Sequence, residues 1–169
     1  VWSYPNPYPE TAELKGYVAF YWDRMDHWYE EDEEVFVHAR DPRVRLDILD
    51  SSRPVRITVG GQIVAKSIRA RMLFETDMPT RYYLPKEDVR MDLLLPSERR
   101  TGCPYKGTAA YWHLNLGEEC FEDLAWVYPE PVAEAARIKG YLCFFNERVE
   151  AVFVAGEKME QPVTKWAPK

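Results

Sequence analysis

Residues 56–65 read RITVGGQIVA, two short runs rich in β-branched residues on either side of a Gly-Gly pair. Gly-Gly suits a two-residue hairpin turn, because both central positions of such a turn adopt positive φ. The stretch therefore predicts a β-hairpin, and it indicates a β-rich fold for the sequence around it.

Similar short runs continue toward the C-terminus, separated by turn signals such as Asp77-Met78-Pro79. The expected strands are residues 69–74, 81–84, 108–115, 125–128, 141–145 and 149–154. Pro85–Asp88 predicts one helical turn, and the Ala-rich residues 132–138 predict a short helix. Regular short strands with Pro and Gly between them favour a mainly β fold, a small antiparallel barrel or sandwich, over βαβ units.

The composition excludes several classes of protein. The 169 residues include 22 Lys plus Arg and 28 Asp plus Glu, a net charge of −6 that argues against nucleic-acid and anionic membrane partners. No run approaches the roughly 18 consecutive apolar residues of a membrane span. The three cysteines form no C-x-x-C pair, which is typical of a reducing compartment. We therefore expect a cytoplasmic protein.

Two segments of the sequence resemble each other at an offset of 124 residues. Residues 1–24, VWSYPNPYPETAELKGYVAFYWDR, align without a gap on residues 125–148, AWVYPEPVAEAARIKGYLCFFNER. The shared residues include rare types, and the offset is far longer than a solenoid period. We expect an internal repeat in a tandem protein, with these parts: the C-terminal tail of an upstream partial copy (1–38), a basic linker (39–54), the complete β domain (55–160) and a tail (161–169).

The two copies are expected to differ after the shared stretch. Apolar residues of the first copy recur at helical spacing and predict an N-terminal amphipathic helix. They are Val18, Tyr21, Trp22, Met25, Trp28 and Tyr29. In the second copy, Val149, Ala151 and Phe153 alternate as in a strand.

Several strings between residues 60 and 131 are specific enough to compare with known families. They are Gly60-Gly61 with Val64-Ala65 and Ser67, Leu73–Thr76, Tyr82–Pro85 with Asp88-Val89, Thr101 with Cys103–Ala109 and Tyr111, and Ala125-Trp126 with Tyr128-Pro129 and Pro131. Together they resemble the bacterial "domain of unknown function 427" family. Ala110 and Val127 depart from the residues usual in that family. The resemblance implies a mainly β fold related to the β-tent architecture, in a bacterial tandem protein.

The resemblance also bears on cofactors. Relatives on the β-tent fold often hold zinc through paired C-x-x-C motifs, which this sequence lacks, so we expect no metal site. The family is sometimes labelled nucleotidyltransferase-like, yet the phosphate-binding Gly-x-x-x-x-Gly-Lys-Ser/Thr pattern is absent and Lys106-Gly107-Thr108 has the wrong upstream spacing. The sequence names no other cofactor.

Three polar residues are the candidates for chemistry. The ammonium of Lys106 would favour the thiolate of Cys103 three residues away, although a free Cys is more often a small buried hydrophobe. A nucleophilic Cys103 would need a His base, and His113 lies ten residues further on. Glu75 follows an apolar run and is expected either to face the interior as an acid or base, or to pair with Arg69, Arg71 or Arg81.

An aromatic set is the candidate for ligand binding. Its members are Tyr83, Tyr105, Tyr111, Trp112, Trp126 and Tyr128. Such rings stack on planar or sugar ligands, but they more often pack in a core or a turn. We expect a small molecule bound in an aromatic-lined pocket, with catalysis left open. A structural module that packs tandem domains or a homodimer through its rings is the alternative, and a sugar-binding module with exposed rings is a third.

Overall fold

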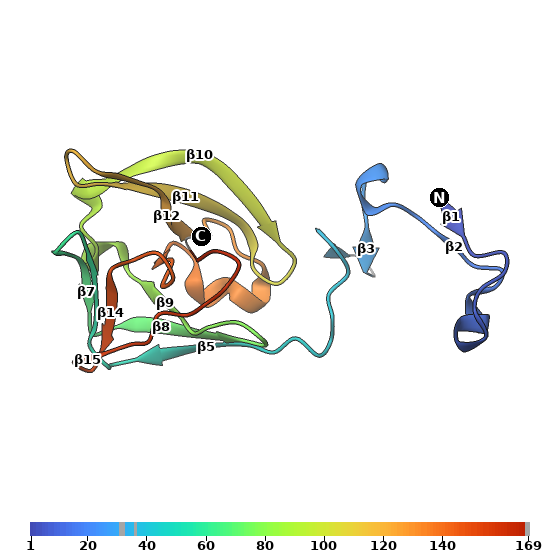
Figure 1. Ribbon diagram of the computed structural model, residues 1–169, viewed down its shortest axis with the longest axis horizontal. Coiled ribbons are helices and arrows are strands. Elements are labelled where there is room, and N and C mark those ends of the chain that lie inside the picture. The colour runs from blue at the N-terminus through green and yellow to red at the C-terminus, as the bar shows by residue number, and fades with distance from the viewer. Residues whose placement is uncertain (31–32, 36, 168–169) are drawn as a thin grey trace. The chain divides into compact units, whose positions relative to one another are not determined.

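The computed structural model describes residues 1–30, 33–35 and 37–167 of the 169-residue chain. The chain forms two compact units, which we call unit 1 (residues 1–40) and unit 2 (residues 41–169). Both are visible in Figure 1. No helix within the described residues has the length and apolar character needed to span a bilayer.

Unit 1 contains short strands and 3₁₀ helices. In chain order they are β1 (Trp2–Ser3), η1 (Pro9–Leu14), β2 (Val18–Ala19), η2 (Trp22–Arg24), β3 (Tyr29–Glu30) and β4 (Glu33–Glu34). β1 pairs with β2 and β3 pairs with β4, both antiparallel. These pairs lie in two separate two-stranded sheets.

The prediction of an N-terminal amphipathic helix was wrong. Residues 18–29 instead form β2, η2 and the start of β3. The rings of Trp22 and Trp28 stack with centroids 4.6 Å apart, and the Trp28 indole donates a 3.0 Å hydrogen bond to the Trp22 carbonyl oxygen. Aromatic and β-branched residues have modest helix propensity, so this ring pairing prevails over the helical spacing.

Unit 2 is built on a seven-stranded sheet in which every neighbouring pair is antiparallel. Its order is β10 (Leu94–Cys103), β11 (Gly107–Asn115), β12 (Cys120–Val127), β13 (Leu142–Phe144), β9 (Arg81–Leu84), β8 (Ala70–Glu75) and β5 (Leu46–Ser51). Among the described residues no pairing joins β10 to β5, so the fold is mainly β and antiparallel but contains no closed barrel.

A second, four-stranded antiparallel sheet completes unit 2. Its order is β15 (Glu157–Lys158), β14 (Ala151–Val154), β6 (Val55–Val59) and β7 (Gln62–Ser67). The 3₁₀ helices of the unit are η3 (Lys86–Asp88), η4 (Met91–Leu93) and η5 (Ala133–Ile138). The predicted hairpin is thereby confirmed as β6 and β7, with φ of 55° at Gly60 and 71° at Gly61.

The seven-stranded sheet separates two hydrophobic cores, because side chains alternate between its faces. In β9, Tyr82 and Leu84 belong to the first core, which β6, β7 and β14 also line, whereas Tyr83 belongs to the second. The second core joins β5, β11 and η5 through Ile48, Tyr111 and Ile138. Figure 1 shows this arrangement, with η5 (orange) between β10–β12 above and β5, β8 and β9 below.

Two strands of the seven-stranded sheet were absent from the sequence prediction. β5 falls within residues 39–54, the expected linker, and pairs with β8 over residues 46–51. β10 reads LLPSERRTGC, in which a proline and three charged residues obscure any strand pattern. Both are end strands of the sheet with exposed positions, so their sequences carry a weaker apolar signal.

Candidate functional site

The structure brings two of the sequence-predicted residues, Glu75 and Lys106, into direct contact. Glu75 ends β8, and Lys106 occupies the turn between β10 and β11. The Lys106 ammonium donates hydrogen bonds of 2.6 and 2.7 Å to the two carboxylate oxygens of Glu75. Their side chains are only 10% and 12% exposed, so this ion pair is largely removed from water.

The expected arginine partners of Glu75 lie elsewhere. Arg69 pairs with Asp88, Arg71 with Asp50 and Arg81 with Glu147. The partner of Glu75 is therefore the lysine of the Cys-Pro-Tyr-Lys-Gly turn, 31 residues away in sequence. Gly107 allows the chain to turn at this point, since its φ of +97° is in the region that L side chains rarely adopt.

Glu75 also lines a pocket of about 430 Å³, which we call the Glu75 pocket. The other lining residues are Arg45, Asp47, Leu49, Phe74 and Thr76. The Thr76 hydroxyl accepts a 2.9 Å hydrogen bond from the Arg45 amide, and the Thr76 amide donates to the Arg45 carbonyl oxygen. These bonds extend the β5–β8 pairing and hold together the two strand ends that form the wall of the pocket.

Cys103 is half-buried at the end of β10, against the second core. It pairs with Gly107 at one end of the β10–β11 ladder, whereas His113 pairs with Leu95 toward the other end. The His113 ring accepts a 3.0 Å hydrogen bond from the Asp123 amide. This arrangement does not make His113 the base of a Cys103 nucleophile.

The predicted aromatic set lies mostly inside unit 2. Tyr83, Tyr111, Trp126 and Tyr128 are buried in the second core, where the Trp126 indole donates a 3.1 Å hydrogen bond to the Tyr83 hydroxyl. Burial raises the pKa of Tyr83 well above its ordinary value, so the phenol stays protonated.

The two remaining rings lie apart from that group. Trp112 is partly buried against the first core, and the Tyr105 hydroxyl accepts a 2.7 Å hydrogen bond from the Asp41 amide. None of the six predicted rings lines the Glu75 pocket.

Sequence reasoning missed a second ion pair, between Arg81 of β9 and Glu147. The Arg81 guanidinium donates two 2.6 Å hydrogen bonds to the Glu147 carboxylate, and the Thr164 hydroxyl donates a third, of 2.7 Å. The guanidinium carbon lies 5.5 Å from the ring centre of Trp126 and 5.6 Å from that of Trp166. The sequence signal was weak, because Arg81 begins a predicted strand and Glu147 lies in a polar turn between Asn146 and Arg148, and neither position identifies the partner.

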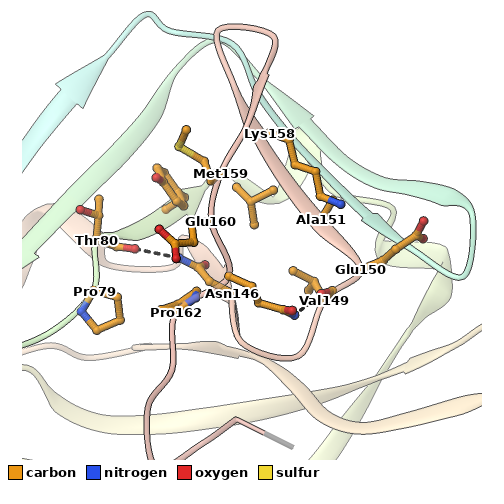
Figure 2. A pocket seen from close by; sticks show the side chains of 13 residues that line it. Pro79, Thr80, Asn146, Val149, Glu150, Ala151, Lys158, Met159, Glu160 and Pro162 are labelled. Carbon is orange, nitrogen blue, oxygen red and sulfur yellow. Dashed lines mark hydrogen bonds between the residues drawn. The ribbon is translucent and has the colours of Figure 1, made fainter.

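A larger pocket, of about 780 Å³, lies where the turn before β9, strand β14 and the segment after β15 meet (Figure 2). Asn146 lines it and donates a 2.8 Å hydrogen bond from its amide nitrogen to the Thr80 carbonyl oxygen. The side-chain oxygen of Asn146 is buried and has no hydrogen-bond partner among the described residues. Tyr82 is the aromatic residue among those that line this pocket.

The described residues do not fit a structural metal. Cys143 is buried, Cys103 is half-buried and Cys120 is exposed, each in a different part of unit 2. No group of three or more His, Cys, Asp or Glu side chains in the described ranges is placed to hold an ion.

Fold and site together define an antiparallel β protein with two cores and a charged pocket at one end of its main sheet. The family model described as "Domain of unknown function (DUF427)" matches residues 1–31 and 47–155, so the chain belongs to this family. The resemblance seen in the sequence is thereby confirmed. The comparison with curated proteins gives no significant match.

Proposed function

We propose that unit 2 binds a small polar molecule in the Glu75 pocket. The observation that carries this proposal is the pocket itself, which places the Arg45–Asp47 ion pair beside Leu49 and Phe74 at the ends of β5 and β8. The largely buried Lys106–Glu75 ion pair lies on the other face of β8, because side chains alternate along a strand, and it holds in place the strand end that forms the pocket wall.

The lining residues indicate the chemistry of the ligand. The Arg45 guanidinium and the Asp47 carboxylate form an ion pair with each other in this pocket. A ligand that carries both charges can exchange with that pair, with its anionic group at Arg45 and its ammonium at Asp47. Leu49 and Phe74 offer apolar contacts beside them. The volume of about 430 Å³ falls within the roughly 300–1,000 Å³ typical of small-molecule sites. We infer a small zwitterion with an apolar substituent, such as a free amino acid.

The proposal is one of binding. Lys106 acts in it by holding Glu75 at the end of β8, and Cys103, at the start of the same turn, lies at the opposite end of the β10–β11 ladder from His113. The buried rings of the second core support the sheet that carries Glu75. Their place is inside the domain, so they do not contribute a stacking surface to the ligand.

The first test measures thermal stabilisation of the full chain by L-leucine, by isoamylamine and by 4-methylpentanoate, which share an apolar branch but differ in charge. We expect L-leucine to raise the unfolding temperature more than either singly charged compound, because only the zwitterion satisfies both charge types in the pocket. Asp47→Asn is expected to reduce the shift. Glu160→Gln, in the larger pocket, is expected to preserve it. Equal shifts from all three compounds would contradict the proposal.

A structural role is the second candidate, and unit 1 is the part of the chain that favours it. Tyr8, Tyr17 and Tyr29 are 81%, 72% and 60% exposed, unlike the buried rings of unit 2. A homodimer formed through these rings would appear in sedimentation velocity as a concentration-dependent increase in mass. A chain that stays monomeric up to high concentration would exclude it.

A further inference from the structure

Part of unit 1 has the same local geometry as the part of unit 2 found 124 residues later. η1 spans Pro9–Leu14 and η5 spans Ala133–Ile138, and these bounds differ by that same offset. In unit 1, Trp2 pairs with Ala19 and Ser3 with Val18. In unit 2, Trp126 pairs with Cys143 and Val127 with Leu142, which is the identical register after the shift.

The turns agree as closely as the strands. The Lys15 amide donates a 3.1 Å hydrogen bond to the Ala12 carbonyl oxygen, as the Lys139 amide does to Ala136. Gly16 and Gly140, at equivalent positions, both have positive φ, of 88° and 73°.

The correspondence extends past the second strand. The Arg24 amide donates to the Tyr21 carbonyl oxygen at 3.1 Å, and the Arg148 amide donates to Phe145 at 2.9 Å. Residues 1–24 thus have the backbone of a β12–η5–β13 segment.

The two segments differ in how exposed their side chains are. Trp2 is 41% exposed and Val18 60%, whereas their counterparts Trp126 and Leu142 are 7% and 0% exposed. In unit 2 the cover comes from β11, where Tyr111 pairs with Trp126, and from β9, where Leu84 pairs with Leu142. Unit 1 therefore exposes the counterparts of side chains that lie in the two cores of unit 2. Within its described residues, no further strand pairs with the outer edge of β1 or of β2.

We propose that residues 1–21 dock, as two added strands with their connecting 3₁₀ helix, onto a β domain of this family that lacks its own counterpart of residues 125–145. Trp2 would lie opposite the partner's equivalent of Tyr111, and Val18 opposite its equivalent of Leu84. Edge pairing of this kind supplies backbone hydrogen bonds, while the apolar side chains give specificity. The family match to residues 1–31 is consistent with this role.

The charge pattern adds a specific contact. Asp23 occupies the position equivalent to Glu147, whose carboxylate pairs with Arg81 in the second core. On docking, Asp23 would meet the partner's equivalent of Arg81. A shorter acid at this position keeps the charge that the partner's arginine requires.

A complete second copy of unit 2 is not the partner, because its β11 and β9 edges are already paired. The sheet order places β12 beside β11 and β13 beside β9. The docking site needs both of those edges free, which only an incomplete domain provides.

The test uses an extended chain in which a second copy of residues 47–124 is fused directly before Val1. Val1 then follows a copy of Leu124, just as its counterpart Ala125 follows Leu124 in unit 2. Hydrogen–deuterium exchange with mass spectrometry then compares peptides from residues 1–21 in the original and the extended full chains. We expect exchange in the extended chain to slow by about tenfold or more, because exposed two-residue strands become central strands of a sheet.

Two variants of the extended chain test which side chains of residues 1–21 are needed for the protection. Val18→Asp is expected to abolish the protection, since the equivalent Leu142 is fully buried. Lys15→Gln is the matched control, because Lys15 and its counterpart Lys139 are both exposed, and it is expected to preserve the protection. An extended chain in which residues 125–145 replace residues 1–21 supplies the reference level.

Three outcomes would overturn the proposal. The first is slow exchange of residues 125–145 in the reference chain together with fast exchange of residues 1–21 in the extended chain. The second is strong protection of residues 1–21 in the original chain at low concentration. The third is protection in the original chain that rises with concentration, which would assign the exposed face to a second copy.

Discussion

The guanidinium of Arg81 and the carboxylate of Glu147 form two hydrogen bonds of 2.6 Å beside the rings of the second core. The Arg81 side chain is 6% exposed and that of Glu147 is not exposed at all. The pair connects β9 to the turn after β13, and Thr164 adds a contact from the C-terminal segment. Three parts of the chain thus meet at one carboxylate.

Removing the charge of Glu147 is expected to destabilise unit 2 strongly. Glu147→Gln leaves the Arg81 guanidinium buried without a counter-charge, and breaking such a pair costs about 3–5 kcal/mol of unfolding free energy. Urea unfolding followed by tryptophan fluorescence measures the loss. Glu122→Gln, at an exposed acid, is the control and is expected to change the stability by less than about 0.5 kcal/mol. A similar effect from both variants would contradict this role of the pair.

The same carboxylate predicts a loss of stability in acid. Burial opposes its ionisation, but hydrogen bonds from Arg81 and Thr164 prevail and lower the pKa of Glu147 below the ordinary 4.5. A lowered pKa in the folded state means that its contribution is complete above the unfolded value and is lost as the pH falls through the folded value. Unfolding free energy should therefore decline below about pH 4.5, and this decline should be shallower in Glu147→Gln. Parallel profiles for the two proteins would exclude this group as the cause.

The turn that presents Lys106 is expected to depend on Gly107. A Cβ at this position would lie 3.0 Å from the Glu130 carbonyl oxygen and 3.3 Å from the Pro131 Cα, both backbone atoms. Gly107→Ala should cost about 1–3 kcal/mol from the strained φ, plus the displacement of residues 130–131. Gly117→Ala is the matched control, since Gly117 has φ of +90° but no atom within 4 Å of a Cβ. A larger loss at Gly117 would show that the close contact is unimportant.

The three cysteines are expected to react with iodoacetamide in order of exposure. Cys120 is exposed and should react first, and the half-buried Cys103 should follow. Burial raises the pKa of Cys143 to about 12, so its thiol stays protonated and should be alkylated only after unfolding. Peptide mass spectrometry at neutral pH resolves the three sites. Faster modification of Cys103 than of Cys120 would restore the hypothesis of an activated thiol.

The sequence predicted the antiparallel β class and many strand positions because turn residues separate short β-branched runs. It also selected Glu75 and Lys106, but not their contact, because that contact depends on how the turn after β10 approaches the end of β8. Helical spacing failed in residues 18–29 because aromatic spacing reflects packing as well as helix formation. The arginine and the acid of the Arg81–Glu147 pair lie 66 residues apart, and only tertiary structure shows that they meet.

The most direct test of the proposed function is a two-dimensional ¹H–¹⁵N NMR titration of the full chain with L-leucine. We expect saturating shifts at the amides of residues 45–49 and 74–76, the two strand ends that form the Glu75 pocket, and weakened shifts in Asp47→Asn. Shifts confined to residues 146–162 would place the ligand in the larger pocket instead. That result, or the absence of saturating shifts in either region, would contradict the proposed site.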